Sequence, residues 1–208
     1  MTVDAFALLV PVKSLPLAKT RLALDTRDTR RLMAAFAEDV LGAACRCPSV
    51  HRLFVVTDEP ELGRGLPMVE VLPDEGAGDL NTAITAAARR VRDGEPALGI
   101  AALCADLPCL LPEDLGHALD ADAGPRWFVA DADGSGTTLL ATVPGTELHP
   151  MFGPGSAARH AESGAVPVPG RLATLRRDVD TTADLEEAVT LGVGPNTARA
   201  LALSSSHC

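Results

Sequence analysis

Short apolar runs alternate along this chain with stretches in which apolar residues recur every three or four positions. The runs predict buried strands over 5–12, 52–57, 68–72 and 98–104. The spaced pattern predicts helices over 28–45 and 80–92, the second with Asp79 as its N-cap and arginines in its last turn. This alternation is typical of α/β proteins, so we expect a mostly parallel sheet with helices on both faces.

The second half of the chain has shorter elements. A helix beginning at Pro112, strands over 127–131 and 138–143, and a short helix over 156–162 are expected. The spacing Thr181-x-x-Asp184 resembles a capping box, and the helix that follows it to Gly192 closes the pattern. Strand pairs around 127–143 and 166–180 predict a small antiparallel addition near the sheet edge. We expect one domain over 1–203 and a frayed tail over 204–208.

Composition narrows the class of protein. An apolar share of 47% supports a full core, which is aliphatic because aromatic residues make up 3% of the chain. The net charge of −10 argues against a nucleic-acid partner. We expect a cytoplasmic protein, because no apolar stretch reaches membrane-spanning length and the start lacks the basic region of a signal peptide. The five cysteines lie mostly in apolar sequence without zinc spacing, and the five histidines are scattered, so we expect reduced, buried thiols and no histidine metal site.

Charged side chains directly follow several predicted strands. Lys13, Asp58, Asp106 and Asp131 all occupy such positions. In open sheets of this class, ligands bind beyond the carboxyl ends of the strands. One crevice is therefore predicted to collect these residues.

The two lysines of the chain lie six residues apart, whereas arginine accounts for the other sixteen basic residues. Lys13 and Lys19 stand beside Arg21, just after the first apolar run. A lysine ammonium is a point charge on a flexible stem, and an arginine guanidinium forks onto two oxygens. The segment is thus a candidate polyphosphate cradle, and a solvated basic loop is the alternative.

Two acidic positions are candidates for a metal site. Asp106 follows the most continuous apolar strand and precedes Leu-Pro, where its carboxylate is suited to Mg²⁺ or, alternatively, to capping a turn. Asp178 and Asp180 share one face of a predicted strand that leads into a helix. One of them could complete the metal site while the other caps the helix, and the spacing leaves both assignments open.

Two loops rich in small residues are candidates for binding an anion. The loop 134–138 brings backbone N–H groups and Thr hydroxyls together, although Gly-Ser-Gly is also an ordinary hairpin turn. The segment 152–156 leads into a helix with Ser156 as the expected N-cap. The motifs GxGxxG, GxxxxGK(S/T), GxSxG and HExxH are missing from meaningful places, which argues against dehydrogenases, P-loop NTPases, α/β-hydrolases and zincins. These parts suit phosphoryl or nucleotidyl transfer.

Taken together and in order, these segments resemble the phosphoenolpyruvate/2-phospho-L-lactate guanylyltransferases of coenzyme F-420 biosynthesis. The resemblance implies a nucleotidyltransferase fold like that of the nucleotide-diphospho-sugar transferases. It extends from the first strand to about Leu203 and rests on Val10–Lys13 with Ala18–Leu22, Asp79–Ile84, Ala105–Pro108, Phe128–Asp131 with Gly136–Leu139, Phe152–His160 and Asp178–Thr181. Gly-Ser-Gly at 134–136 departs from the Gly-Thr-Gly expected of the family and leaves Thr137 in place.

The resemblance implies that GTP and phosphoenolpyruvate react to give enolpyruvyl-diphospho-guanosine and pyrophosphate. It assigns Mg²⁺ to Asp106 with Asp178, or with Asp180 as the rival. It assigns the phosphorylated acid to Thr137, Gly153 and Ser156, the GTP phosphates to Lys13, Lys19 and Arg21, and the nucleoside to Asn81.

The choice of acceptor rests on analogy. The Ala- and Arg-rich composition fits a bacterium with GC-rich DNA, which favours phosphoenolpyruvate over 2-phospho-L-lactate or 3-phosphoglycerate. The alternatives are a different nucleotidyltransferase and a non-catalytic sensor of phosphorylated metabolites. The sequence predicts no oligomeric state.

Overall fold

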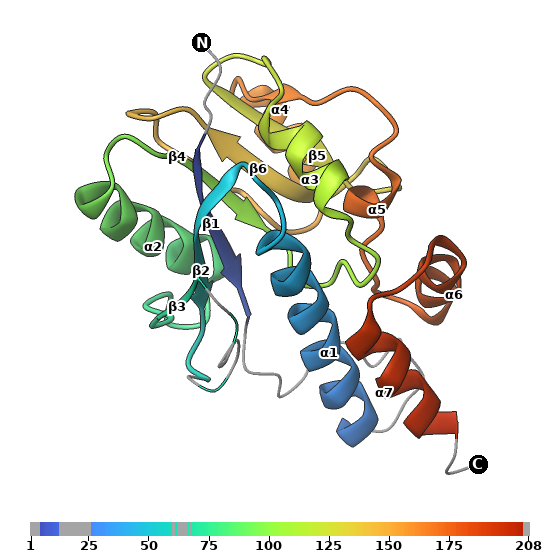
Figure 1. The fold of residues 1–208 in the computed structure, drawn as a ribbon. Helices are drawn as coiled ribbons and strands as arrows, with labels where there is room; N and C mark the ends of the chain where they lie inside the picture. Colours follow the sequence, from blue (N-terminus) through green and yellow to red (C-terminus); the bar gives the residue numbers. More distant parts are fainter. Residues whose placement is uncertain (1–4, 13–25, 60, 62–65, 67, 206–208) are drawn as a thin grey trace.

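The computed structural model describes residues 5–12, 26–59, 61, 66 and 68–205. A seven-stranded sheet with the order β3-β2-β1-β4-β6-β5-β7 organises this part of the chain (Figure 1). Its strands are β1 (Phe6–Pro11), β2 (Val50–Val56), β3 (Val69–Leu72), β4 (Gly99–Leu103), β5 (Arg126–Ala130), β6 (Thr137–Thr142) and β7 (Val166–Pro167). Its helices are α1 (Thr26–Ala44), α2 (Leu80–Gly94), α3 (Pro112–Leu119), α4 (Ser156–Glu162), α5 (Ala173–Arg176), α6 (Thr182–Leu191) and α7 (Pro195–Ser205).

Strand β6 reverses the direction of the sheet. Strands β3, β2, β1 and β4 are parallel neighbours, whereas β6 pairs antiparallel with both β4 and β5. The carboxyl ends of β4 and β5 and the amino end of β6 therefore lie at the same edge of the sheet. This confirms the mostly parallel sheet and the antiparallel pair over 127–143.

The second antiparallel pair, expected over 166–180, was wrong. The structure has a two-residue strand, β7, which pairs parallel with β5 and is followed by the short helix α5. Pro167 and Pro169 explain the difference, because a proline cannot donate a hydrogen bond to a strand ladder.

Side chains of the sheet point alternately to its two faces, and each face packs into its own apolar core. Phe6, Leu8 and Val10 face one core with residues of α1 and α3, where Phe6 meets Trp127 edge to face at 5.9 Å. Ala7 and Leu9 face the other core, which α2 and α4 cover. The helices therefore lie on both faces, as the sequence predicted, and Asp79 caps α2 by accepting a hydrogen bond from Thr82 N.

Helix α7 is an addition to the predicted elements, the last of which ends at Gly192. It lies beside α1 (Figure 1), and residues of both helices share a third apolar cluster. Its pattern is weak because Ala, Ser and Thr fill much of it. The helix includes Ser204 and Ser205, and residues 206–208 lie outside the described part.

A buried carboxylate from α1 holds the first turn of α7. Asp39, 7% exposed, accepts hydrogen bonds from Asn196 N at 3.0 Å, Asn196 Nδ2 at 3.0 Å and Thr197 N at 2.8 Å. The two backbone N–H groups belong to the first turn of α7 and have no partner within their own helix. A Cβ at Gly194 would clash with this carboxylate, so the approach requires glycine. A side chain 157 positions away thus does the work of an N-cap.

In the described ranges, no helix combines the length and apolar character that crossing a bilayer requires.

We predict that Asp39→Ala lowers the free energy of unfolding by about 2–3 kcal/mol, because buried N–H groups lose a charged acceptor. Thermal unfolding would show a midpoint lowered by roughly 5–10 °C. Glu38→Ala, at the exposed neighbouring position on α1, is the matched control and should leave the midpoint unchanged. Equal midpoints for the two variants would contradict the capping role.

Candidate active site

The shared edge of β4, β5 and β6 collects three of the predicted site residues. Asp106 follows β4, Asp131 follows β5, and Thr137 begins β6. The Val179 N–H donates to the Asp106 carbonyl at 3.0 Å, which fixes the segment of Asp178 beside this edge. By contrast, Asp58 is exposed after β2, and β1 separates that strand from β4. This edge of the sheet thus gathers Asp106, Asp131 and Asp178.

Negative charge accumulates around Asp178. Burial, followed by the carboxylates of Asp106, Asp131 and Asp180, raises the pKa of Asp178 to about 7. Asp178 is half-buried, whereas Asp180 is exposed. A divalent cation would relieve this repulsion by favouring the ionised carboxylates.

The donor set suits Mg²⁺ in its usual mode of binding. Mg²⁺ in nucleotide sites typically takes one or two protein carboxylates and completes its shell with phosphate and water oxygens. Among the described residues, no three carboxylate, imidazole or thiol side chains form a ready-made cage. Asp106 and Asp178 therefore fit a metal that is held jointly with a nucleotide.

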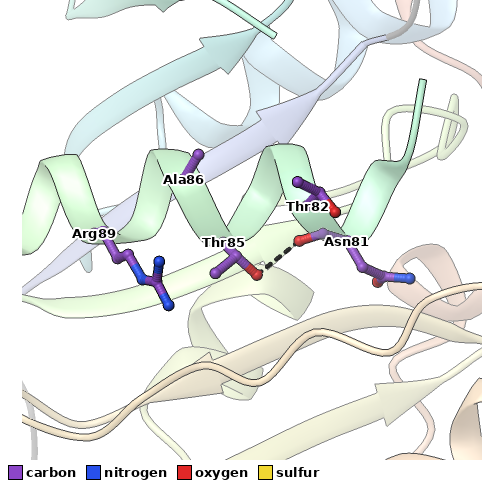
Figure 2. A pocket seen from close by; sticks show the side chains of 5 residues that line it. All are labelled: Asn81, Thr82, Thr85, Ala86 and Arg89. Atoms are coloured by element: carbon purple, nitrogen blue, oxygen red, sulfur yellow. Dashed lines mark hydrogen bonds between the residues drawn. The ribbon is translucent and has the colours of Figure 1, made fainter. Parts of the chain in front are cut away.

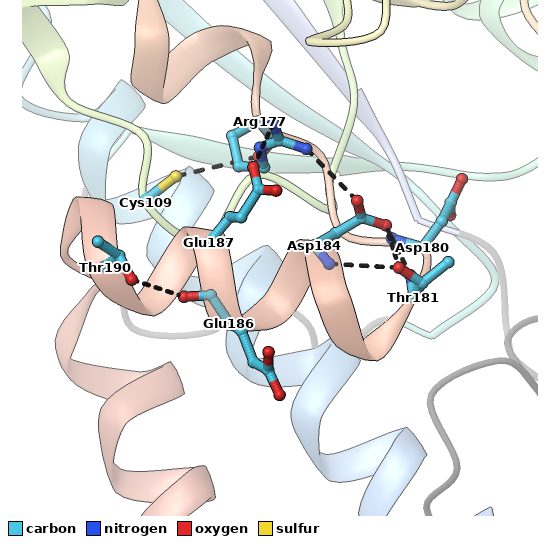
Figure 3. Close-up of polar contacts among 8 residues, drawn as sticks. All are labelled: Cys109, Arg177, Asp180, Thr181, Asp184, Glu186, Glu187 and Thr190. Atoms are coloured by element: carbon cyan, nitrogen blue, oxygen red, sulfur yellow. Dashed lines mark hydrogen bonds and ion pairs between the residues drawn. The ribbon is translucent and has the colours of Figure 1, made fainter.

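Neither Asp178 nor Asp180 caps the helix that follows them, which corrects one of the two roles considered for this pair. Thr181 caps α6 with Asp184 in a reciprocal capping box, as the sequence spacing predicted. Arg177 bridges Asp184 at 3.4 Å and Glu187 at 2.7 Å, and Figure 3 shows the Asp180 carboxylate directed away from this group. The segment 178–180 is not a strand either.

Asp131 braces the loop that precedes Thr137. Its two carboxylate oxygens accept hydrogen bonds from Ser135 N at 2.9 Å and Gly136 N at 2.7 Å. A Cβ at Gly136 would clash with the same carboxylate. Glycine at this position therefore lets Asp131 fix the start of β6.

The loop over 151–156 is braced by three side chains. Asn81 accepts from Phe152 N at 2.7 Å and donates to Phe152 O at 3.1 Å. Arg159 donates to Met151 O at 2.9 Å and to Pro154 O at 2.6 Å. The imidazole Nε2 of His160 accepts from Met151 N at 3.0 Å.

Gly155, not Ser156, is the N-cap of α4, which corrects the expected cap. Gly155 and Gly153 have φ angles of 73° and 119°, which favour glycine. Ser156 is the first helical residue, and its hydroxyl donates instead to Thr137 Oγ1 at 3.0 Å. Because Ser156 N also donates to Gly153 O at 3.0 Å, the three predicted acid-binding residues lie together.

Sequence reasoning missed His160, which is fully buried behind these hydroxyls. Its Nδ1 lies 2.9 Å from Thr137 Oγ1, and its ring packs on Phe128 and Phe152. The signal was its i, i+4 spacing from Ser156, which places both side chains on one face of α4. Burial, and then the positive charges of Arg159 and Arg126, lowers the pKa of His160 to about 4.

Asn81 has a structural task that the sequence did not reveal. Its amide holds the Phe152 backbone, and the same residue lines a hollow of about 270 Å³ with Thr82, Thr85, Ala86 and Arg89 (Figure 2). Its assignment to the nucleoside stays a prediction. So do the roles of Lys13, Lys19 and Arg21, which lie outside the described residues.

Comparisons with known proteins assign this chain to a family. The family model described as "Guanylyl transferase CofC like" matches residues 6–201. The chain belongs to this family. A phosphoenolpyruvate guanylyltransferase of Streptomyces avermitilis is 48% identical over 95% of this chain and 94% of the relative. Another, from Thermomonospora curvata, is 47% identical over 93% of this chain and 87% of the relative.

Solved structures agree on the fold of this CofC-like chain. A protein of Desulfovibrio desulfuricans named as a nucleotide-diphospho-sugar transferase aligns with a TM-score of 0.63 at 18% identity, over 89% of this chain and 96% of that one. A 4-diphosphocytidyl-2C-methyl-D-erythritol synthase aligns with a TM-score of 0.59 at 16% identity, over 90% and 98%. These likenesses confirm the expected nucleotidyltransferase fold.

We predict that Gly136→Ala lowers kcat/KM for guanylyl transfer by about 10- to 100-fold, because the new Cβ displaces the Asp131 brace and with it Thr137. Steady-state kinetics with thermal unfolding in parallel would test this. Ser135→Ala, which removes an exposed hydroxyl from the same loop, is the control. Near-normal turnover of Gly136→Ala would show that the brace does not position the site.

A second prediction concerns pH. Because the pKa of His160 is lower in the folded protein, the unfolded chain binds this proton more tightly than the folded one. The neutral ring therefore contributes fully to stability above pH 6.5, and this contribution is lost as the pH falls towards 4. By pH 5 the loss should reach about 2 kcal/mol in the free energy of unfolding. Titration of the His160 ring followed by NMR should give a midpoint near 4. A midpoint near 6.5 would contradict this account.

Proposed function

We propose that this protein transfers GMP from GTP to phosphoenolpyruvate, forming enolpyruvyl-diphospho-guanosine and pyrophosphate. The observation that carries the proposal is that the carboxylates of Asp106 and Asp178 lie together at the sheet edge where Thr137 begins β6. The chain that carries them belongs to the CofC-like family. Relatives named phosphoenolpyruvate guanylyltransferase, at 47–48% identity, support the choice of acceptor. We place the reaction in coenzyme F-420 biosynthesis on the family resemblance.

The proposed reaction needs no general base. The acceptor phosphate is already ionised near neutral pH, so one of its oxygens can attack the α-phosphorus of GTP directly. A new P–O bond forms there, the bond to the β-phosphate oxygen breaks, and pyrophosphate leaves with that electron pair. The protein therefore has to align two anions and offset their repulsion.

The residues divide this task between two sides of the crevice. Asp106 and Asp178 would hold Mg²⁺, and Asp178 is favoured over Asp180 because it is the less exposed and the one raised in pKa by Asp106. When bound, the ion would neutralise phosphate charge and draw the α-phosphate and the acceptor phosphate together. Thr137, Ser156 and the Gly153 loop would receive the phosphorylated acid, while Lys13, Lys19 and Arg21 would bind the GTP phosphates and the leaving pyrophosphate.

The primary test is pyrophosphate release from GTP and Mg²⁺ with phosphoenolpyruvate, 2-phospho-L-lactate and 3-phosphoglycerate added separately. We expect release with phosphoenolpyruvate, and little when CTP or UTP replaces GTP. Release with another acceptor would change the substrate and keep the chemistry. A protein that binds GTP and releases no pyrophosphate with any acceptor would contradict the enzyme assignment and favour a sensor.

The metal assignment yields a separate prediction. Asp106→Asn and Asp178→Asn should each lower kcat by about 10²–10³-fold and weaken the rise in melting temperature that Mg²⁺ with GTP produces, because each removes a charged ligand. Asp180→Asn, which removes a nearby exposed carboxylate, is the matched comparison and should change both quantities much less. Should Asp180→Asn be the damaging variant and Asp178→Asn the mild one, the assignment of the second ligand is reversed.

A further inference from the structure

The hydrogen bonds around His160 determine which ring nitrogen carries its proton. Met151 N is a backbone amide, which can only donate, and it lies 3.0 Å from Nε2. Nε2 must therefore be the acceptor nitrogen. In a neutral imidazole the proton is then on Nδ1, which lies 2.9 Å from Thr137 Oγ1 and donates to it.

The ring is held in this state by its surroundings. His160 is fully buried, packs edge-on against Phe152 at 5.5 Å between ring centroids, and also contacts Phe128. The charged groups that act on it are the guanidinium groups of Arg159 and Arg126, both of which disfavour a second proton. The imidazole therefore stays neutral across the physiological range of pH.

This tautomer leaves one hydroxyl proton of the Thr137–Ser156 pair available. Thr137 Oγ1 accepts from His160 Nδ1 and from Ser156 Oγ, so the proton of Thr137 itself remains. If the bond between the two hydroxyls ran the other way, the proton of Ser156 would remain instead. Within the described ranges, no hydrogen bond takes up that proton, although Thr137 and Ser156 are only 6% and 1% exposed.

The opposite tautomer would remove this donor. With the proton on Nε2, the ring would face the Met151 N–H with a second donor, and Nδ1 would have to accept from Thr137 Oγ1. The Ser156 proton would then be used on Thr137, and no hydroxyl proton would be left. An anion beside the pair would meet lone pairs instead of an O–H group, which is repulsive.

We propose that His160 is a positioning residue that makes the Thr137–Ser156 hydroxyl pair a hydrogen-bond donor to the anionic acceptor. His160 does not touch the acceptor; it acts through the direction of the hydrogen bonds in front of it. The same ring holds Met151 N, so it also fixes the loop that carries Gly153. The inference rests on the proposed function in one respect, namely that the anion at this pair is the phosphorylated acid.

Two substitutions separate this role from simple packing. His160→Asn places an amide N–H where Nδ1 lies and keeps the donation to Thr137, whereas His160→Phe keeps a ring against Phe128 and Phe152 and has no donor. We expect His160→Phe to raise KM for phosphoenolpyruvate by about 10- to 100-fold, because the pair keeps its spare proton and loses the Nδ1–H contact that fixes its direction, with KM for GTP nearly unchanged. His160→Asn should restore KM for phosphoenolpyruvate to within about threefold of the wild type.

The wild-type protein provides a readout that does not depend on activity. Two-bond ¹H–¹⁵N correlation spectra of the imidazoles should show His160 as the neutral Nδ1–H form, and His117→Asn, at an exposed site on α3, should leave that signal unchanged. Calorimetric binding of phosphoenolpyruvate should weaken in His160→Phe and recover in His160→Asn. An Nε2–H tautomer would overturn the proposal, and so would unchanged phosphoenolpyruvate binding by a folded His160→Phe.

Failure of the proposed function would look different. A wild-type protein that releases no pyrophosphate with any acceptor would refute guanylyl transfer, while the tautomer and the binding of phosphoenolpyruvate would still be measured directly. If His160→Phe does not fold, the tautomer of the wild type and the affinity of His160→Asn decide the matter.

Discussion

The antiparallel placement of β6 between β4 and β5 is the constraint on which the site depends. Because β6 runs against both neighbours, its first residue, Thr137, lies at the edge where β4 and β5 end. A carboxylate that follows a strand and a hydroxyl that begins one thus reach the same crevice. With a parallel strand in this position, Thr137 would lie at the opposite edge, about 20 Å from Asp106 for strands of this length. The reversal brings the carboxylates of Asp106 and Asp178 and the hydroxyl of Thr137 to one edge of the sheet.

Polar groups at this edge are used in two contrasting ways. On the donor side, Asp131, Asn81 and Arg159 are occupied with backbone groups of the two loops, so these side chains fix geometry and leave hydroxyl and amide donors for a ligand. On the acidic side, Asp178 is surrounded by like charge, and burial adds to the cost of its ionisation. Well-satisfied hydrogen bonds make the first side rigid. The unrelieved repulsion of the second is a local cost to folding that a bound cation would remove.

The sequence predicted the elements whose pattern is local and strong. The continuous apolar runs of β1 and β4, the N-cap Asp79 and the capping box of Thr181 with Asp184 are set by neighbours within a few residues, and all were confirmed. Helix α7 and the segment 166–180 depend on distant partners instead. Asp39 caps α7 from 157 positions away, and the prolines of 166–180 leave room for pairing only as a short edge strand. Likewise, motifs could only nominate the candidate site residues, whereas the clamp by Asn81 and the position of His160 behind Thr137 are tertiary contacts.

A phosphorylated acid carries both a phosphate and a carboxylate, so a site that selects it has to distinguish anion positions by more than charge. Cations alone would attract any anion of the cell, and long side chains would adapt to many shapes. In the Thr137–Ser156 pair, the buried neutral imidazole of His160 sets the direction of the hydroxyl proton that remains free. The ring cannot turn without losing its hydrogen bond to Met151 N or to Thr137 Oγ1. Under the proposed function, neutral donors would also add no charge that competes with a metal ion at Asp106 and Asp178 for the nucleotide phosphates. Under the proposed function, the carboxylates with their metal ion and the hydroxyl pair with its fixed direction would therefore hold two anions close together and still distinguish them.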